Sequence, residues 1–253
     1  MSIFLRLIIL SITLLLLSGC ATIGQRTSAE DVETSNRYSD IGFRHLEFDN
    51  GQQARRAFRE ALELDRNSGR AHLGLALVYQ RDAEAELAET YFHRAMELDP
   101  AVQVRYLYAQ FLFREGRIND SKRELIRVTS DPDFINRGSA FEDLALVSLY
   151  EDDIEAAKRH FDRAITLNRM LPMPYWHLAN IHLAQGNQPQ ALRYYEGFES
   201  LVQAEVMDHS EESLILGLRV TEAVQREETY SGLLELLQEQ FPDSQYLKGV
   251  DNE

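Results

Sequence analysis

A pattern of small and aromatic residues recurs about every 34 residues and limits the folds that this chain can adopt. Each copy has a small residue, an aromatic residue four positions later and a small residue three positions after that. The copies are Ala54, Phe58, Ala61; Ala88, Phe92, Ala95; Ala157, Phe161, Ala164; the looser Ala191, Tyr195, Phe198; and the weaker Ser121, Leu125, Val128. Because spacings of i, i+4 and i+7 share one helical face, the pattern predicts one helix per copy.

A second amphipathic stretch precedes each copy and carries a small residue of its own. These small residues are Gly42, Ala76, Ala109, Ala145 and Ala179. Turn-forming residues separate the two stretches, as at Asp49-Asn50-Gly51 and Gly186-Asn187, and proline ends a helix at Asp99-Pro100. The repeating unit is therefore predicted to be a helix, a turn and a second helix, with small residues where the two helices cross.

This unit has the pattern of the tetratricopeptide repeat (TPR) and predicts an all-α TPR solenoid. About six helix-turn-helix repeats would stack into a right-handed superhelix. We expect repeats at residues 35–68, 69–101, 102–137, 138–171, 172–209 and 210–246, followed by a C-terminal tail over 247–253. The last repeat is degenerate, with Gly217 as its close-packing residue.

The first twenty residues predict an export signal. A positive start at Arg6 precedes an apolar stretch over residues 7–17, which is too short to span a bilayer comfortably. Leu17-Ser18-Gly19-Cys20 resembles the bacterial lipobox, and Cys20 is the only cysteine. The resemblance implies removal of a signal peptide, residues 1–19, and acylation of Cys20. An ordinary signal peptide or a signal anchor with an incidental cysteine is the alternative.

The residues after the lipobox predict a tether. Residues 20–34 comprise the lipidated cysteine and a small, polar stretch without periodicity, which we interpret as flexible. The alanine at position 21, where lipoproteins retained at the inner membrane have aspartate, implies by resemblance export to the outer membrane. The folded part is then expected to face the periplasm.

Composition narrows the classes of partner. The formal charge is −15, from 26 basic and 41 acidic residues, and no basic stripe is present, so nucleic acid is an unfavourable partner. A single cysteine excludes an internal disulfide and a cysteine-based zinc cluster. We predict no cofactor other than the covalent lipid on Cys20.

The first helices of the repeats are expected to line the concave side of the superhelix. Ten apolar residues fall at positions predicted to project into this groove. They are Phe43, Leu46, Leu73, Leu77, Tyr106, Phe113, Leu146, Leu149, Trp176 and Leu183. A wholly solvated wall would be polar, so these residues predict a peptide-binding groove with aromatic anchors. Packing between neighbouring repeats is the alternative role for each of them.

Titratable residues do not form a catalytic pattern, and we predict that the protein is not an enzyme. His177 and His182 are five positions apart, which places them on different helix faces and disfavours zinc binding. His160 is expected on a solvated face. No HExxH, GxSxG or phosphate-binding loop occurs. The carboxylate runs, such as Glu151-Asp152-Asp153, fall at turns or helix starts, where they complement the helix dipole or remain solvated.

The chain resembles the PilW/PilF (pilotin) family of type IV pilus biogenesis lipoproteins along its whole length. The most specific stretch is residues 140–169, AFEDLALVSLYEDDIEAAKRHFDRAITLNR. Further matches are SLILGLR over 213–219, Phe241-Pro242-Asp243-Ser244, and the tandem Tyr194-Tyr195 that leads to Phe198.

The resemblance implies an outer-membrane lipoprotein that binds the type IV pilus secretin subunit. The pilotin would carry that subunit along the lipoprotein sorting machinery, so that the subunit multimerises in the outer membrane. The alternative function is a TPR lipoprotein scaffold that recruits cell-wall hydrolases or proteases.

Two departures from the repeat pattern are Ser121 and Leu125 in the third repeat and the turn Asp82-Ala83-Glu84 without glycine. The sequence does not indicate which repeats bind the partner.

Overall fold

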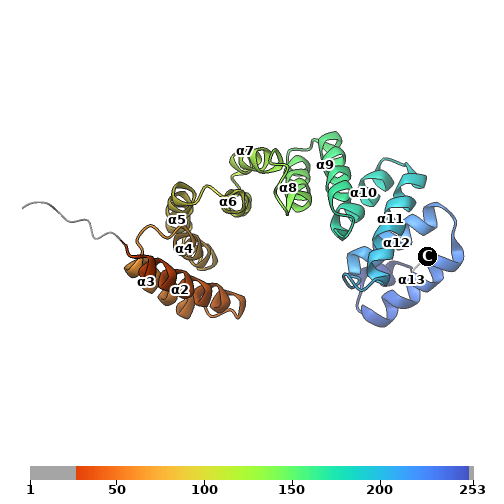
Figure 1. Ribbon diagram of the computed structural model, residues 1–253. Coiled ribbons are helices and arrows are strands. Elements are labelled where there is room, and N and C mark those ends of the chain that lie inside the picture. The colour runs from red at the N-terminus through yellow and green to blue at the C-terminus, as the bar shows by residue number, and fades with distance from the viewer. Residues whose placement is uncertain (1–26, 251–253) are drawn as a thin grey trace, which may run out of the picture. The chain divides into compact units, whose positions relative to one another are not determined.

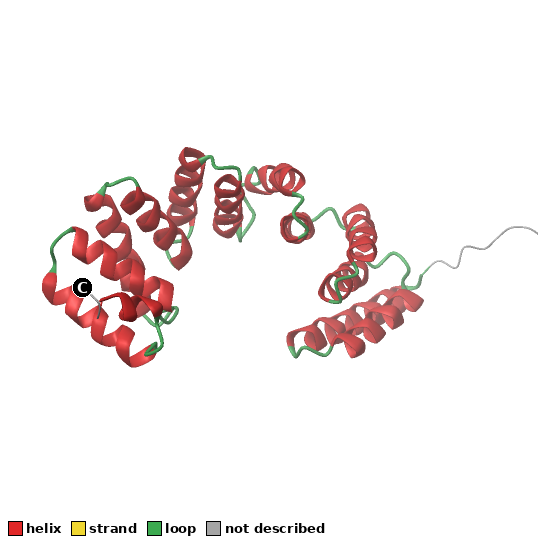
Figure 2. Ribbon diagram, turned by 180° about the vertical axis from the view of Figure 1, so that it is seen from behind, coloured by secondary structure: helices red, strands yellow, loops and turns green. Residues whose placement is uncertain are grey.

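The computed structural model describes residues 27–250, and this part of the chain consists of helices joined by short turns and loops (Figures 1 and 2). The helices are α2 (Ala29–Glu47), α3 (Gly51–Leu64), α4 (Gly69–Arg81), α5 (Ala85–Leu98), α6 (Val102–Arg114), α7 (Ile118–Thr129), α8 (Arg137–Tyr150), α9 (Ile154–Leu167), α10 (Pro172–Ala184), α11 (Gln188–Gln203), α12 (Glu211–Ala223), α13 (Glu227–Gln240) and α14 (Gln245–Val250). The predicted all-α class is confirmed.

Each predicted repeat corresponds to one pair of packed helices, beginning with α2 and α3 and ending with α12 and α13. The chain divides into two compact units at Leu98. Unit 1 contains α2 to α5, and unit 2 contains α6 to α14. The helix-turn-helix organisation inferred from the repeated triplets is therefore present in both units.

Helical structure extends beyond the predicted boundaries at both ends. The tether was expected to reach residue 34, but α2 begins at Ala29 because Ser28 and Asp31 form a capping box. At the other end, α14 runs into the predicted tail. The predicted signal peptide and Cys20 lie outside the described residues. Within residues 27–250, no helix combines the length and apolar character needed to span a membrane.

Phe58 shows why the repeated triplet sets the packing. Its side chain is fully buried, and so are the small residues Ala54 and Ala61 of the same triplet. A Cβ atom added to Gly42 would lie 2.5 Å from the Phe58 ring, and one added to Gly74 would lie 2.2 Å from it. The ring thus contacts both the first helix of its own repeat and that of the next. Gly42 was expected at such a crossing, but Gly74 was not.

The turns inside the six helix pairs share one backbone conformation. Each has one residue with φ between 58° and 72°. These residues are Asp49, Ala83, Gly116, Asp152, Gly186 and Gln225. In each turn, the residue after it donates its N–H to a carbonyl five positions back, as Glu84 does to Tyr79 at 2.9 Å. This is the Schellman motif, which satisfies the free carbonyls at the end of a helix.

Replacing Ala83 by glycine is expected to stabilise the protein. Ala83 has φ of 58°, a left-handed conformation that costs an L-residue roughly 1–2 kcal/mol, whereas glycine adopts it freely. Glycine loses part of this advantage because its unfolded chain has more freedom. Ala83→Gly should therefore raise the free energy of unfolding by about 0.5–1 kcal/mol, measured by urea denaturation. The reverse change Gly116→Ala, at φ of 72°, should lower the free energy of unfolding. If both variants changed the free energy of unfolding in the same direction, the explanation would be contradicted.

Candidate peptide-binding surface

Nine of the ten residues predicted to line a groove are half-buried, so one side of each packs on the core and the other remains accessible. In unit 1 they are Phe43, Leu46, Leu73 and Leu77, which we call the N-terminal surface. In unit 2 they are Phe113, Leu146, Leu149, Trp176 and Leu183, which we call the C-terminal surface. All belong to the first helices of their repeats, at spacings that place neighbours on one helix face. Core packing, the alternative role, therefore applies to one side of each residue, and peptide binding by the accessible side stays a prediction.

Tyr106, the tenth residue, departs from the prediction. Its side chain is only 6% exposed, and its ring packs edge-on against Phe134 at 5.4 Å between ring centroids. Its hydroxyl hydrogen-bonds to Asp143, and burial raises the pKa of Tyr106. Tyr106 follows the correct helical period, but the connection before α8 covers it with Phe134. It therefore belongs to the core of unit 2 rather than to the C-terminal surface.

The N-terminal surface is partly covered by charged side chains. Phe43 packs edge-on against Phe58 with 5.0 Å between ring centroids, and the Arg70 guanidinium lies 5.6 Å from the centre of the Phe43 ring. Arg70 also forms an ion pair with Asp40 at 2.6 Å. Phe43 is thus held by an aromatic contact and a cation–π contact, which restrain its side chain at this surface.

Trp176 is the large aromatic residue of the C-terminal surface. Its indole lies perpendicular to the His177 ring at 4.9 Å. It also lines a hollow of about 220 Å³ together with Met173, Phe198 and Met207. Methionine side chains adapt to irregular ligands, and a half-buried tryptophan offers a large rigid contact area. This hollow has the composition of a pocket for an apolar side chain.

A second cavity of about 280 Å³ lies among α6, α7 and α8. It is lined by Gln110, Phe113, Arg114, Ser121, Leu125, Asp143 and Leu146. Two of these residues, Phe113 and Leu146, belong to the C-terminal surface. Ser121 and Leu125 are the two departures from the triplet pattern in the third repeat, so the sequence contained a signal for this cavity that went unused. Asp143 was missed because it falls outside the predicted groove positions.

Burial disfavours the charged forms of two neighbouring carboxyl groups, those of Glu142 and Asp143. The Gln110 side-chain amide donates a hydrogen bond to Asp143 at 2.9 Å, and the Tyr106 hydroxyl also bonds to Asp143, but burial still raises the Asp143 pKa. Burial and the neighbouring Asp143 together raise the pKa of Glu142 to about 7. Two adjacent acids on α8, the helix that carries Leu146 and Leu149, therefore have charged forms that are costly in the free protein.

Replacing Glu142 by glutamine is expected to stabilise the protein at high pH only. The folded protein binds a proton at Glu142 up to about pH 7, whereas the unfolded chain loses it near 4.5. The free energy of unfolding therefore falls as the pH rises from about 5 to 8, because Glu142 has to ionise in the folded protein. Glu142→Gln should raise the free energy of unfolding by about 1–2 kcal/mol at pH 8, a value reduced by solvent screening, and by almost nothing at pH 5.

The control for this prediction is Glu235→Gln, which makes the same change at an exposed position of α13. Urea denaturation at both pH values measures the effect. A pH-independent difference between the wild type and Glu142→Gln would contradict the assigned protonation.

The histidines mainly serve as aromatic packing elements. The His177 ring stacks on Phe161 at 4.8 Å, and burial lowers the pKa of His177 to about 4. His182 stacks on Tyr194 at 5.5 Å. His160 is half-buried against Phe141, not on the solvated face expected from the sequence. Within the described part of the chain, no three His, Cys, Asp or Glu side chains form a group that could hold a metal ion.

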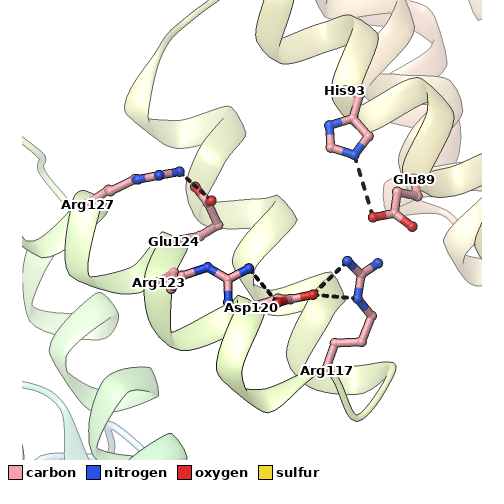
Figure 3. Close-up of polar contacts among 7 residues, drawn as sticks. All are labelled: Glu89, His93, Arg117, Asp120, Arg123, Glu124 and Arg127. Atoms are coloured by element: carbon pink, nitrogen blue, oxygen red, sulfur yellow. Dashed lines mark hydrogen bonds and ion pairs between the residues drawn. The ribbon is translucent and has the colours of Figure 1, made fainter.

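The second helix of the third repeat, α7, carries several ion pairs. Along α7, Asp120 pairs with Arg117 at 2.7 Å and with Arg123 at 2.6 Å, and Glu124 pairs with Arg127 at 2.6 Å (Figure 3). The arginine partners are exposed, so these pairs contribute little stability but keep the helix face solvated. On α5 in unit 1, His93 lies 3.6 Å from Glu89 (Figure 3).

Comparison with known proteins identifies relatives with this arrangement. No protein-family model matches the chain. The type IV pilus assembly protein PilF of Pseudomonas aeruginosa is 29% identical over 233 residues, which cover 90% of each chain. A solved structure of P. aeruginosa PilF is 27% identical and superposes with a TM-score of 0.79 over 88% of this chain and 100% of that one.

More distant structures share the fold. PilW, a widely conserved type IV pilus biogenesis factor, is 22% identical, with a TM-score of 0.71 over 85% of this chain and 97% of its own. YrrB, a TPR protein with an unusual peptide-binding site, is 16% identical, with a TM-score of 0.52 over 76% of this chain and 90% of its own. The TPR fold predicted from the repeats is therefore confirmed.

Proposed function

Because the chain belongs to the PilF/PilW family of type IV pilus assembly proteins, we propose that it is a pilotin that binds the pilus secretin subunit. The apolar surfaces of its TPR units bind that subunit, and the protein promotes the subunit's outer-membrane localisation and multimerisation. Its role is that of an adaptor rather than an enzyme.

The observation that carries this proposal is the recurrence of half-buried apolar residues on the first helices. Leu73 and Leu77 in unit 1 and Leu146 and Leu149 in unit 2 lie at such positions. Apolar side chains at helical spacing suit an amphipathic helix or an extended peptide of a partner. On α7, by contrast, ion pairs join Asp120 to Arg117 and Arg123.

The lipid anchor proposed at Cys20 completes this function. Acyl chains on Cys20 would hold the mature chain at the outer membrane, and each buried CH₂ contributes about 0.8 kcal/mol. The sorting machinery for lipoproteins would then determine where the bound secretin subunit arrives. The lipid anchor would thus determine the membrane to which the protein goes, and the apolar surfaces would bind the secretin subunit.

Deletion of the gene tests the proposal. We expect loss of twitching motility and of secretin multimers, and recovery of both with the wild-type gene. A gene with Cys20→Ser should not restore multimers in the outer membrane, because the unanchored protein cannot deliver its cargo. Altered septation or peptidoglycan turnover with normal secretin multimers would contradict the proposal and support a scaffold for cell-wall enzymes.

A further inference from the structure

Aromatic residues occupy the same place in the first helices of the third and fifth repeats. When each repeat is counted so that its triplet begins at position 20, Tyr106 and Trp176 both fall at position 5. A long connection follows the second helix of each of these repeats, over residues 130–136 and 204–210. The two repeats therefore share an aromatic side chain and a connection that is long enough to fold over it.

In the third repeat, the connection closes over the aromatic residue. Phe134 packs edge-on against Tyr106 with 5.4 Å between the ring centroids, and Tyr106 is only 6% exposed. Phe134 also packs against the buried cluster that contains Leu125 and Val128. The chain's own phenylalanine thus fills the space beside position 5 in this repeat.

In the fifth repeat, the corresponding space is open. The connection supplies Met207 instead of a ring, and both Met207 and Trp176 remain half-buried. Both line the hollow of about 220 Å³ described above, together with the fully buried Phe198. An apolar cavity of about 150 Å³ is large enough to bind benzene, so this hollow has room for one phenyl ring.

The serines that line the hollow are already hydrogen-bonded within the chain. Ser210 and Ser213 form the capping box of α12, in which the Ser213 N–H donates to Ser210 Oγ at 3.2 Å and the Ser210 N–H donates to Ser213 Oγ at 2.9 Å. The His209 ring lies 3.0 Å from both Ser213 Oγ and Glu199 Oε1. These hydrogen bonds make the hollow suited to an apolar guest.

The connection that borders the hollow is acidic. Residues 204–212 contain four acids and no lysine or arginine. Among residues 27–250, Glu205, Asp208 and Glu212 take part in no ion pair. Hydrogen bonds from its own backbone N–H and from Ser210 lower the pKa of Glu212, so its carboxyl group is charged at neutral pH. A partner segment with a basic residue is therefore attracted to this side of the hollow.

We propose that the hollow receives a phenylalanine side chain of the secretin subunit, from a segment that carries a lysine or arginine beside it. The ring packs on Trp176 as Phe134 packs on Tyr106, and the basic residue lies near Asp208. Edge-on contacts between aromatic rings are favourable beyond the area that they bury. The inference rests on the proposed function and adds to it the residue type that the C-terminal surface recognises.

Fluorescence tests this proposal, because Trp176 is the only tryptophan of the chain. Overlapping peptides of the secretin subunit that lack tryptophan are titrated against the wild type, Met207→Phe and Val206→Phe. Met207→Phe fills the hollow from the chain itself, so it should weaken the best peptide by about tenfold or more. It should also abolish the shift of Trp176 emission to shorter wavelength that we expect when the peptide binds to the wild type.

Val206→Phe is the matched control, because it adds the same ring to the same connection at a residue that is 38% exposed and does not line the hollow. It should leave the affinity nearly unchanged. Circular dichroism should show both variants folded. The intact secretin subunit is measured against the same three proteins by isothermal titration calorimetry, with the same order of affinities expected.

Changes in the peptide test the guest without altering the protein. Replacing its phenylalanine by leucine should weaken binding to the wild type by about tenfold and have little effect on binding to Met207→Phe, as in a double-mutant cycle. Replacing the adjacent basic residue by norleucine should lower the affinity at low salt more than at high salt. The protein variant Asp208→Asn with Glu212→Gln should remove most of that salt dependence.

Four results would overturn the inference. Equal binding of the intact secretin subunit by the wild type and Met207→Phe refutes the hollow and leaves the proposed function intact. A best peptide that keeps its affinity when each phenylalanine is replaced by leucine refutes the aromatic guest. Dimer formation that shifts Trp176 emission without a peptide would assign the hollow to a second copy of the chain. If the wild type binds neither the peptides nor the intact subunit, the proposed function fails and the inference fails with it.

Discussion

Replacing Phe113 and Trp176 together by alanine is expected to weaken binding of the secretin subunit by about 100-fold or more. Both side chains are half-buried, and each lines a cavity at the C-terminal surface. Partly exposed aromatic side chains beside such cavities contribute most of the affinity in many peptide interfaces. Isothermal titration calorimetry with the purified secretin subunit measures the change. Tyr106 is left intact because its burial would make the result a test of folding.

The matched control replaces Ile126 and Leu167 by alanine. These side chains are 51% and 38% exposed on the second helices α7 and α9. The control should retain wild-type affinity, and circular dichroism should show both double variants folded. Equal affinities in the two double variants would show that the C-terminal surface does not bind the subunit.

Replacing Phe58 by alanine should destabilise unit 1 by about 3–5 kcal/mol. The ring is fully buried between Gly42 and Gly74, which have no side chains that could move into the space left behind. The loss therefore combines the transfer of a phenyl ring with the cost of a cavity. Urea denaturation followed by circular dichroism measures the change in the free energy of unfolding.

Phe48→Ala is the control, because Phe48 is 70% exposed at the end of α2 and the chemical change is the same. It should change stability by less than about 0.5 kcal/mol. Repeat proteins unfold in neighbouring segments, so hydrogen exchange should accelerate in α2, α3 and α4 of the Phe58 variant. Uniform acceleration through α12 and α13 would contradict this local explanation.

Much of the fold could be predicted because the repeat encodes local periodicity and packing together. Ala54, Phe58 and Ala61 have helical spacing, and all three are fully buried as that spacing requires. The turns were also predictable where glycine marks them, as at Gly116. The turn at Ala83 adopts the same conformation without glycine, since the helices on both sides determine the backbone there.

The error at the start of α2 was avoidable from the sequence, whereas the error at Tyr106 was not, because its burial depends on a contact with a distant residue. Ser28 and Asp31 form a capping box whose spacing is visible in the sequence, so the start of α2 could have been placed earlier. Burial of Tyr106 depends on Phe134, which comes from the connection before α8. Helical periodicity records which face a residue occupies, but it does not record what a later segment places over that face.

Site-specific crosslinking tests most directly whether the first helices hold the secretin subunit. A photoreactive phenylalanine derivative at Leu149, on the C-terminal surface, is compared in cells with the same derivative at Ile126 on α7. The account predicts a crosslink to the secretin subunit from position 149 and none from position 126. A crosslink from position 126 alone, or from neither position in cells that assemble pili, would contradict it.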